Sequence, residues 1–126
     1  RIVPLDGRPH VPPSIKGYMG DSRGRWDGNT LVVETKNLNG RNGVGGNGGG
    51  TTSDRITLTE RFTMLDANTL QYEVTIDDPG TWARPWTIAF PWKRDQSYGR
   101  FEYACHEGNY AMKNILTGAR ADDAAK

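Results

Sequence analysis

The chain has 126 residues, which is enough for one domain with a hydrophobic core. Its 16 basic and 15 acidic side chains nearly cancel, so no overall charge attracts nucleic acid or an anionic membrane. The sequence has no run of about eighteen apolar residues and only one cysteine, Cys105, which excludes a membrane-spanning helix and an internal disulfide.

Residues 1–15 (RIVPLDGRPHVPPSI) are expected to form an extended N-terminal arm, because four of the seven prolines lie in them. The apolar residues Ile2, Val3 and Leu5 can add one short edge strand to a sheet, but Pro4 excludes a central strand. If further strands precede this arm in a longer protein, the sheet has an unpaired edge that the arm of a second copy can cover. The three apolar residues are therefore the predicted assembly arm of a homo-oligomer or filament.

Residues 16–108 are predicted to form an antiparallel β domain. A strand-like run over residues 18–26 and the run TLVVETKNL flank an Asp-Gly turn at Asp27 and Gly28, which is typical of a β-hairpin. The segment 39–50 (NGRNGVGGNGGG) contains seven glycines and is expected to be a flexible surface loop. It lacks a Gly-Lys-Ser/Thr ending, which excludes a phosphate-binding P-loop.

Four more strand-like segments follow this loop: ITLTERFTML, TLQYEVTID, WARPWTIAFPW and FEYACHEG. Their period of two indicates strands with one buried face. Residues 109–120 place apolar side chains on one stripe at helical spacing, which predicts a C-terminal helix followed by a tail to residue 126. About seven short strands and one helix predict an all-β fold, an antiparallel meander that forms a small barrel or a sandwich.

One acidic residue interrupts the apolar face of the strand ITLTERFTML. Ile56, Leu58, Phe62 and Met64 alternate along that face, and Glu60 occupies the middle place. A buried carboxylate needs a partner, and the expected partners are Tyr72 on the adjoining strand and an arginine. The arginines considered are Arg25, Arg61 and Arg84. Three interpretations remain open: a structural ion pair, the polar anchor of a ligand pocket, or a catalytic acid or base whose pKa is raised by burial.

A second group of interest is the row formed by Trp82, Arg84 and Trp86. Residues that alternate along an extended strand point to the same side, so a guanidinium between two indoles can hold a sugar ring or a planar carboxylate. The same arrangement can instead hold a corner of the sheet rigid. With Trp26 and His106 added, the predicted ligand-binding set is Trp26, Glu60, Tyr72, Trp82, Arg84, Trp86 and His106.

The segment YACHEGNY offers little for metal or nucleophile chemistry. His106 faces away from both Cys105 and Glu107 on a strand, and the only other histidine is His10 in the arm. A zinc or copper site needs three or four ligands, so neither a metal nor another cofactor is expected. His106 is predicted to line the mouth of a pocket or to cap the strand-to-helix junction. If the protein is an enzyme, the expected catalytic residues are Glu60, His106 and Asp77.

Four blocks of the sequence carry a resemblance that spans most of the chain: YMGDSRGRWDGNTLVVET, TERFT, TIDDPGTWARPW and YACHEGNY. Together they resemble a family of uncharacterised secreted bacterial proteins, in which the first block begins with Trp where this chain has Tyr18. The resemblance implies export to the periplasm or the extracellular space, and a precursor with a signal peptide and an N-terminal region. It carries no assigned activity, so it transfers no catalytic residue. The chain starts at Arg1 rather than Met, which fits a processed fragment.

These features favour an extracellular, non-enzymatic β domain that binds a small molecule or glycan through a pocket lined by aromatic residues and arginine. One alternative is a structural subunit of a filament assembled through the N-terminal arm. Another alternative is a carbohydrate-active hydrolase or lyase. The expected partners are a glycan or a second copy of the chain, with neither nucleic acid nor an inserted membrane segment.

Overall fold

The computed structural model of the protein describes residues 1–41, 52–99 and 110–124. The chain divides into two compact units, Arg1–Arg94 and Asp95–Lys126. In chain order, the elements are β1 (Asp21–Asp27), β2 (Thr30–Lys36), β3 (Thr57–Asp66), β4 (Thr69–Asp77), β5 (Trp86–Lys93) and α1 (Ala111–Ala124).

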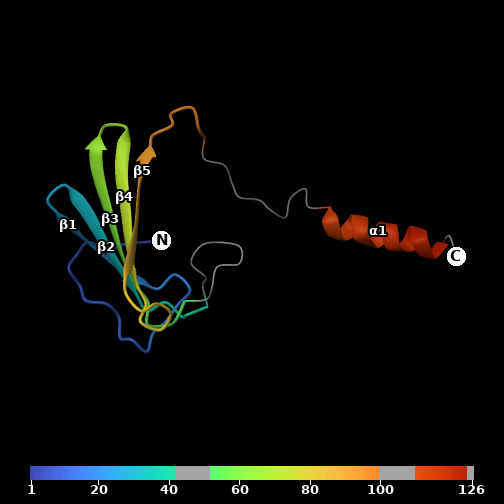
Figure 1. The fold of residues 1–126 in the computed structure, drawn as a ribbon, viewed down its shortest axis with the longest axis horizontal. Coiled ribbons are helices and arrows are strands. Elements are labelled where there is room, and N and C mark those ends of the chain that lie inside the picture. The colour runs from blue at the N-terminus through green and yellow to red at the C-terminus, as the bar shows by residue number, and fades with distance from the viewer. Residues whose placement is uncertain (42–51, 100–109, 125–126) are drawn as a thin grey trace. The chain divides into compact units, whose positions relative to one another are not determined.

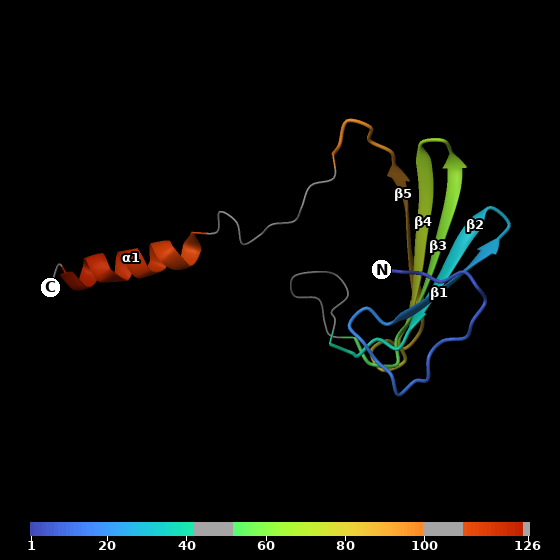
Figure 2. The same cartoon turned by 180° about the vertical axis from the view of Figure 1, so that it is seen from behind.

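The first unit contains one five-stranded sheet with the order β1-β2-β3-β4-β5, in which every neighbouring pair is antiparallel (Figure 1). This meander confirms the predicted all-β class with a single C-terminal helix. Of the two predicted forms, a barrel or a sandwich, the described strands do not close into a barrel, because β1 and β5 lie at opposite ends of the strand order. Figure 2 shows the same open sheet from behind.

Local chemistry explains where three predicted strands begin or fail to form. Gly20 has a left-handed φ of 63°, so the backbone turns there and β1 starts at Asp21 rather than near residue 18. The strand β5 starts at Trp86 because Pro85 has no N–H to donate to a ladder. Ile2, Val3 and Leu5 form no strand, although the Pro4 carbonyl accepts one bond from the Gly24 N–H at 2.9 Å. The predicted strand FEYACHEG lies wholly within residues 100–109, outside the described residues.

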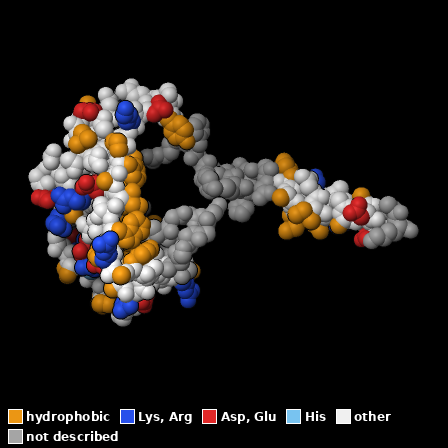
Figure 3. Space-filling model, in the orientation of Figure 1, with side chains coloured by type: hydrophobic (Ala, Val, Ile, Leu, Met, Phe, Trp, Pro, Cys, Tyr) orange, Lys and Arg blue, Asp and Glu red, His pale blue; other side chains and the backbone are white. Residues whose placement is uncertain are grey.

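The two faces of the sheet differ in chemistry. Residues paired across the strands share a face, and side chains alternate along each strand. We call one side the apolar face; its central rows contain Gly24–Val33–Glu60–Val74–Ile88 and Trp26–Leu31–Phe62–Tyr72–Phe90. The opposite side, the polar face, carries Arg61, Glu73 and a row of threonines. Figure 3 shows hydrophobic side chains gathered in a band along this unit.

A small core lies at one end of the apolar face. Leu38, Ile56 and Ile76 are buried together. Leu58, Val74, Trp82 and Trp86 pack against them while partly exposed. Toward the other end of the strands the apolar side chains stay open to solvent: Phe90 is 40% exposed and Trp92 is 45% exposed.

The second unit contains α1, which confirms the predicted C-terminal helix. The helix ends at Ala124, four residues beyond the predicted end at residue 120. Residue 109, where the predicted helix begins, lies outside the described residues. None of the residues of α1 is buried, and Met112, Ile115 and Leu116 are exposed. In the ranges that the structure describes, no helix is both long and apolar enough to cross a membrane.

Candidate functional site

The centre of the candidate site is Glu60, in the middle strand and the middle row of the apolar face. Its neighbours across the strands are Val33 and Val74, and the residue is 7% exposed. The Tyr72 hydroxyl donates a hydrogen bond to Oε1 of Glu60 at 3.0 Å. The sequence prediction that Glu60 points inward and meets Tyr72 is therefore confirmed.

The cation that pairs with Glu60 is Arg1, from the N-terminal arm. Its Nη2 lies 2.6 Å from Oε2 of Glu60. None of the three arginines expected from the sequence fills this role: Arg61, for example, lies on the polar face and pairs with Asp27 at 3.1 Å. Oε2 makes this ion pair, but no donor among the described residues is aligned for a hydrogen bond to it. That leaves one strong acceptor site on Glu60 for a further donor.

Tyr72 is held in its neutral form by this environment. Burial, followed by the hydrogen bond to Glu60 and its negative charge, raises the pKa of Tyr72 from 10.0 to about 12, and the charge of Arg1 opposes the rise. The hydroxyl therefore stays a donor to the carboxylate at any physiological pH. Glu60 and Tyr72 act as one polar spot in an apolar surface.

Three further aromatic rings adjoin this polar spot. Tyr72 stacks on Trp92 with ring centroids 4.7 Å apart and planes at 15°. Phe62 lies 5.1 Å from Tyr72, and Phe90 lies 5.4 Å from it in an edge-on arrangement. We call Phe62, Tyr72, Phe90 and Trp92 the aromatic cluster. Such tilted and stacked pairs are favourable arrangements, so the rings hold each other in place while keeping exposed outer faces.

The predicted Trp–Arg–Trp platform is not an extended row. Residues 83 and 84 form a bend before β5 begins. Trp82 and Trp86 meet each other edge-on with centroids 5.4 Å apart and pack on the core, whereas Arg84 is exposed. The two indoles therefore contribute to packing at this corner of the sheet. The indole N–H of Trp86 is nevertheless buried without a hydrogen bond in the described part of the chain.

The remaining predicted site residues fall in different places. Trp26 lies on the apolar face at the β1 edge and is 63% exposed. Asp77 ends β4 opposite Thr57, which is the polar face, so the structure does not bring it together with Glu60. His106 lies outside the described residues.

The predicted assembly arm contacts its own sheet. Side chains of Val3 and Leu5 lie over Gly24, where an added Cβ would come within 2.8 Å and 2.5 Å of them. Ile2 points away and is 88% exposed. We call residues 1–12 the strap, because they run from Glu60 on the apolar face across the β1 edge to the polar face.

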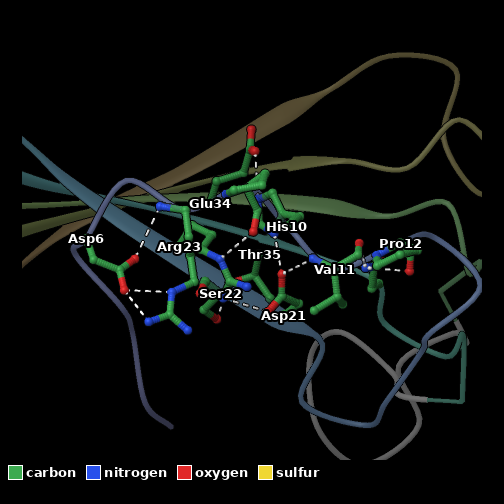
Figure 4. A network of polar contacts seen from close by, with 12 residues as sticks. Asp6, His10, Val11, Pro12, Asp21, Ser22, Arg23, Glu34 and Thr35 are labelled. Atoms are coloured by element: carbon green, nitrogen blue, oxygen red, sulfur yellow. Dashed lines mark hydrogen bonds and ion pairs between the residues drawn. The ribbon is translucent and has the colours of Figure 1, made fainter.

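On the polar face the strap is attached through His10 (Figure 4). Its Nδ1 lies 2.7 Å from Oδ2 of Asp21 on β1, and its Nε2 lies 3.0 Å from Oε1 of Glu34 on β2. The N–H of Val11 donates to the same Asp21 oxygen at 3.1 Å. The sequence analysis did not find this network, because His10 lies in a segment without periodicity and meets the strands only after folding.

Both carboxylates that hold His10 are stabilised in their ionised form. Burial raises the pKa of Asp21, but hydrogen bonds from His10 and the Val11 N–H, together with Arg23, lower it further than burial raises it. The hydrogen bond from Lys36 and then that from His10 lower the pKa of Glu34 against burial. An open cleft of about 210 Å³ adjoins the network and is bordered by Arg8, Arg23 and Arg25 among others.

A second buried carboxylate is Asp78, to which the sequence pattern assigns no role. It is 1% exposed and accepts hydrogen bonds from the Ser53 N–H, the Ser53 hydroxyl, the Thr81 hydroxyl and the Gly80 N–H. Burial raises its pKa, yet these bonds more than compensate and lower it from 3.8 to about 2. With all its donors supplied by two loops, Asp78 is a structural anchor that ties the segment before β3 to the turn after β4.

Among residues 1–41, 52–99 and 110–124, no group of three or more histidine, cysteine or acidic side chains is arranged to hold a metal ion. A second open cleft, of about 250 Å³, is bordered by Lys16, Lys36, Asp54 and Arg55, but Lys16 and Lys36 already form ion pairs there or beside it. Comparison with family models, with curated proteins and with solved structures found no match to this chain. The resemblance described from the sequence blocks therefore stays a prediction.

Proposed function

We propose that the sheet unit is a non-enzymatic binding domain whose apolar face takes a small molecule or glycan. The observation that carries this proposal is Glu60, set beside partly exposed aromatic rings: its buried Oε2 pairs with Arg1 but accepts no aligned hydrogen bond from the described residues. A ligand with a flat apolar side and hydroxyl groups at its edge satisfies both features, because its ring stacks on aromatic faces while a hydroxyl donates to Glu60. The proposed setting outside the cell rests on the resemblance of the sequence.

The aromatic cluster supports this choice of ligand. Trp92 and Phe90 expose 45% and 40% of their surface beside Tyr72, and Ile88 extends the same side of β5 with 38% exposed. Exposed apolar surface that surrounds a single polar group is typical of a recognition site rather than of ordinary surface. Catalysis is a weaker alternative, because Asp77 lies on the opposite face from Glu60.

The first test is calorimetric titration of the protein with soluble cello-, xylo- and chito-oligosaccharides and with the planar dye anilinonaphthalene sulfonate. We expect at least one of these probes to bind. Trp92→Ala should weaken that binding at least about tenfold, because it removes the largest exposed ring of the cluster. Glu60→Gln should weaken binding of an oligosaccharide by about tenfold, since a hydrogen bond to a charged acceptor is lost, and should spare the dye.

The matched control is Tyr18→Ala, which removes an exposed ring outside the strands. The affinity of this variant for the bound probe should equal that of the parent protein. Thermal unfolding of each variant checks that the sheet is intact. Failure of every probe to bind, or equal weakening by Tyr18→Ala and Trp92→Ala, would contradict the proposal.

A further inference from the structure

The strap covers the centre of the proposed site. Arg1 lies over Oε2 of Glu60 at 2.6 Å, and that oxygen is buried. Val3 and Leu5 lie on the same apolar face above Gly24. A ligand hydroxyl can therefore reach the free acceptor on Glu60 only if the strap moves.

Besides the ion pair of Arg1 with Glu60 and the packing on Gly24, individual hydrogen bonds hold the strap along its length. At the β1 edge there is one backbone hydrogen bond, from the Gly24 N–H to the Pro4 carbonyl at 2.9 Å. Arg23 donates to the Pro9 carbonyl at 3.1 Å, and Asn37 donates to the Val11 carbonyl at 2.9 Å. The contact that joins the strap to two strands at once is His10, between Asp21 and Glu34.

An imidazole between two carboxylates depends on its protonation. The protonated ring has two N–H donors and a positive charge, so it binds Asp21 and Glu34 together. The neutral ring has one donor, and its other nitrogen then presents a lone pair to a carboxylate oxygen. Histidine is the side chain whose charge ordinarily changes between about pH 5 and 8, whereas the two carboxylates stay ionised over that range.

Other charges around the ring do not cancel this effect. Asp21 also pairs with Arg23 through its other oxygen at 2.7 Å, and Glu34 also pairs with Lys36 at 2.7 Å. Arg8 borders the same cleft but pairs with Asp6 of the strap, and Arg25 borders the cleft as well. Arg23 contacts the Asp21 oxygen that His10 does not contact, whereas Lys36 shares Oε1 of Glu34 with the ring.

We propose that the strap is a pH-dependent cover of the Glu60 site, held closed by protonated His10 and released as the ring loses its proton. The protonated ring has one more N–H donor than the neutral ring, so the closed state is favoured at low pH and the open state at high pH. This inference rests on the proposed function for what the open site does. The detachment of the strap itself is independent of any ligand.

Amide hydrogen exchange in the ligand-free protein tests detachment directly. The readout is the exchange rate of the Gly24 N–H, which donates to the Pro4 carbonyl of the strap. This rate is corrected for the faster base-catalysed exchange of any amide at higher pH. Protection of this amide should fall at least about tenfold between pH 5.5 and pH 8. The reason is that protonated His10 loses one hydrogen bond to a carboxylate, and a hydrogen bond between charged groups contributes about 1.5 kcal/mol or more, which corresponds to about tenfold. His10→Gln, whose side chain does not titrate, should show the same protection at both pH values.

The matched control is Arg61→Gln, which removes a charged side chain of the polar face that pairs with Asp27 at the end of β1. It should keep the pH dependence of the parent protein. Protection that does not change with pH in the parent, or that changes equally in His10→Gln, would overturn the inference. The exchange measurement uses no ligand, so it can be interpreted even if no probe binds in the titrations. The binding titrations can likewise be interpreted if the exchange does not depend on pH.

If both proposals hold, the affinity of a bound oligosaccharide should be about tenfold higher at pH 8 than at pH 5.5 in the parent protein. In His10→Gln it should be equal at the two values. A different result would be an affinity that does not change with pH although the strap detaches. That result would support the binding site but contradict the role of the strap as its cover.

Discussion

At the scale of single residues, the buried carboxylates of this protein serve different ends. Asp78 has every hydrogen-bonding position filled by Ser53, Gly80 and Thr81, and its environment favours the ionised form. Glu60 has one oxygen bonded to Tyr72 and one without a hydrogen bond. A saturated buried carboxylate stabilises a fold, whereas an unsaturated one retains capacity for a partner.

The pKa of Asp78 gives a stability prediction with a definite sign. Since its folded pKa lies near 2 and its ordinary value is 3.8, the ionised form contributes stability that is fully present above about pH 4 and is lost as the pH falls toward 2. Asp78→Asn should lower the free energy of unfolding at pH 7 by about 2 kcal/mol, and should remove this part of the acid dependence. Urea unfolding followed by tryptophan fluorescence reports it, because all four tryptophans lie in the sheet unit.

Asp77→Asn is the matched control, because Asp77 is adjacent in sequence but exposed at the end of β4. It should change the free energy of unfolding by no more than about 0.5 kcal/mol. Equal losses in the two variants at pH 7 would show that Asp78 is not the anchor described above.

At the scale of elements, alternation predicted most strand positions and the position of Glu60. Period two along TLQYEVTID and ITLTERFTML places Tyr72 and Glu60 on one face, and the observed register brings them within hydrogen-bonding distance. The same alternation occurs in barrels, sandwiches and open sheets, so it does not determine closure. The bend at residues 83–84 was missed because the alternation of Trp82, Arg84 and Trp86 was given more weight than Pro85, which interrupts backbone pairing.

Contacts made by the strap could not be predicted, for a different reason. The strap has no hydrophobic period, so its path depends on the shape of the folded sheet edge. Glu60 pairs with Arg1, which lies 59 positions away in the sequence. His10 of the strap pairs with Asp21, which lies 11 positions away. A glycine at position 24, inside a strand, was the one local signal of a close backbone approach.

Gly24 provides the prediction at this scale. In Gly24→Ala the new Cβ comes within 2.5 Å of Leu5 Cδ2 and 2.8 Å of Val3 Cγ1, so both side chains must move, which weakens the packing of the strap on β1. Protection of the residue-24 amide from hydrogen exchange at pH 5.5 should fall at least about tenfold. Gly17→Ala, where the added Cβ has nothing within 4 Å, should leave that amide unchanged. Unchanged protection in Gly24→Ala would mean that the strap tolerates the added methyl group.

At the scale of the whole molecule, an open sheet carries distinct chemistry on its two faces, and the proposed binding belongs to one of them. The polar face presents Thr59, Thr75 and Thr87 in one row, with a hydrogen bond of 2.8 Å between the last two hydroxyls. The apolar face presents the aromatic cluster and Glu60. Side chains, rather than backbone amides, therefore report which face a ligand touches.

The most direct measurement is NMR mapping of side-chain signals at pH 8 while the protein is titrated with whichever oligosaccharide binds in calorimetry. The account predicts that the ring signals of Tyr72, Phe90 and Trp92 shift with the ligand concentration, and that the methyl signals of Thr59, Thr75 and Thr87 stay in place. Shifts confined to the threonine row, or to α1, would contradict the claim that the apolar face around Glu60 is the binding site.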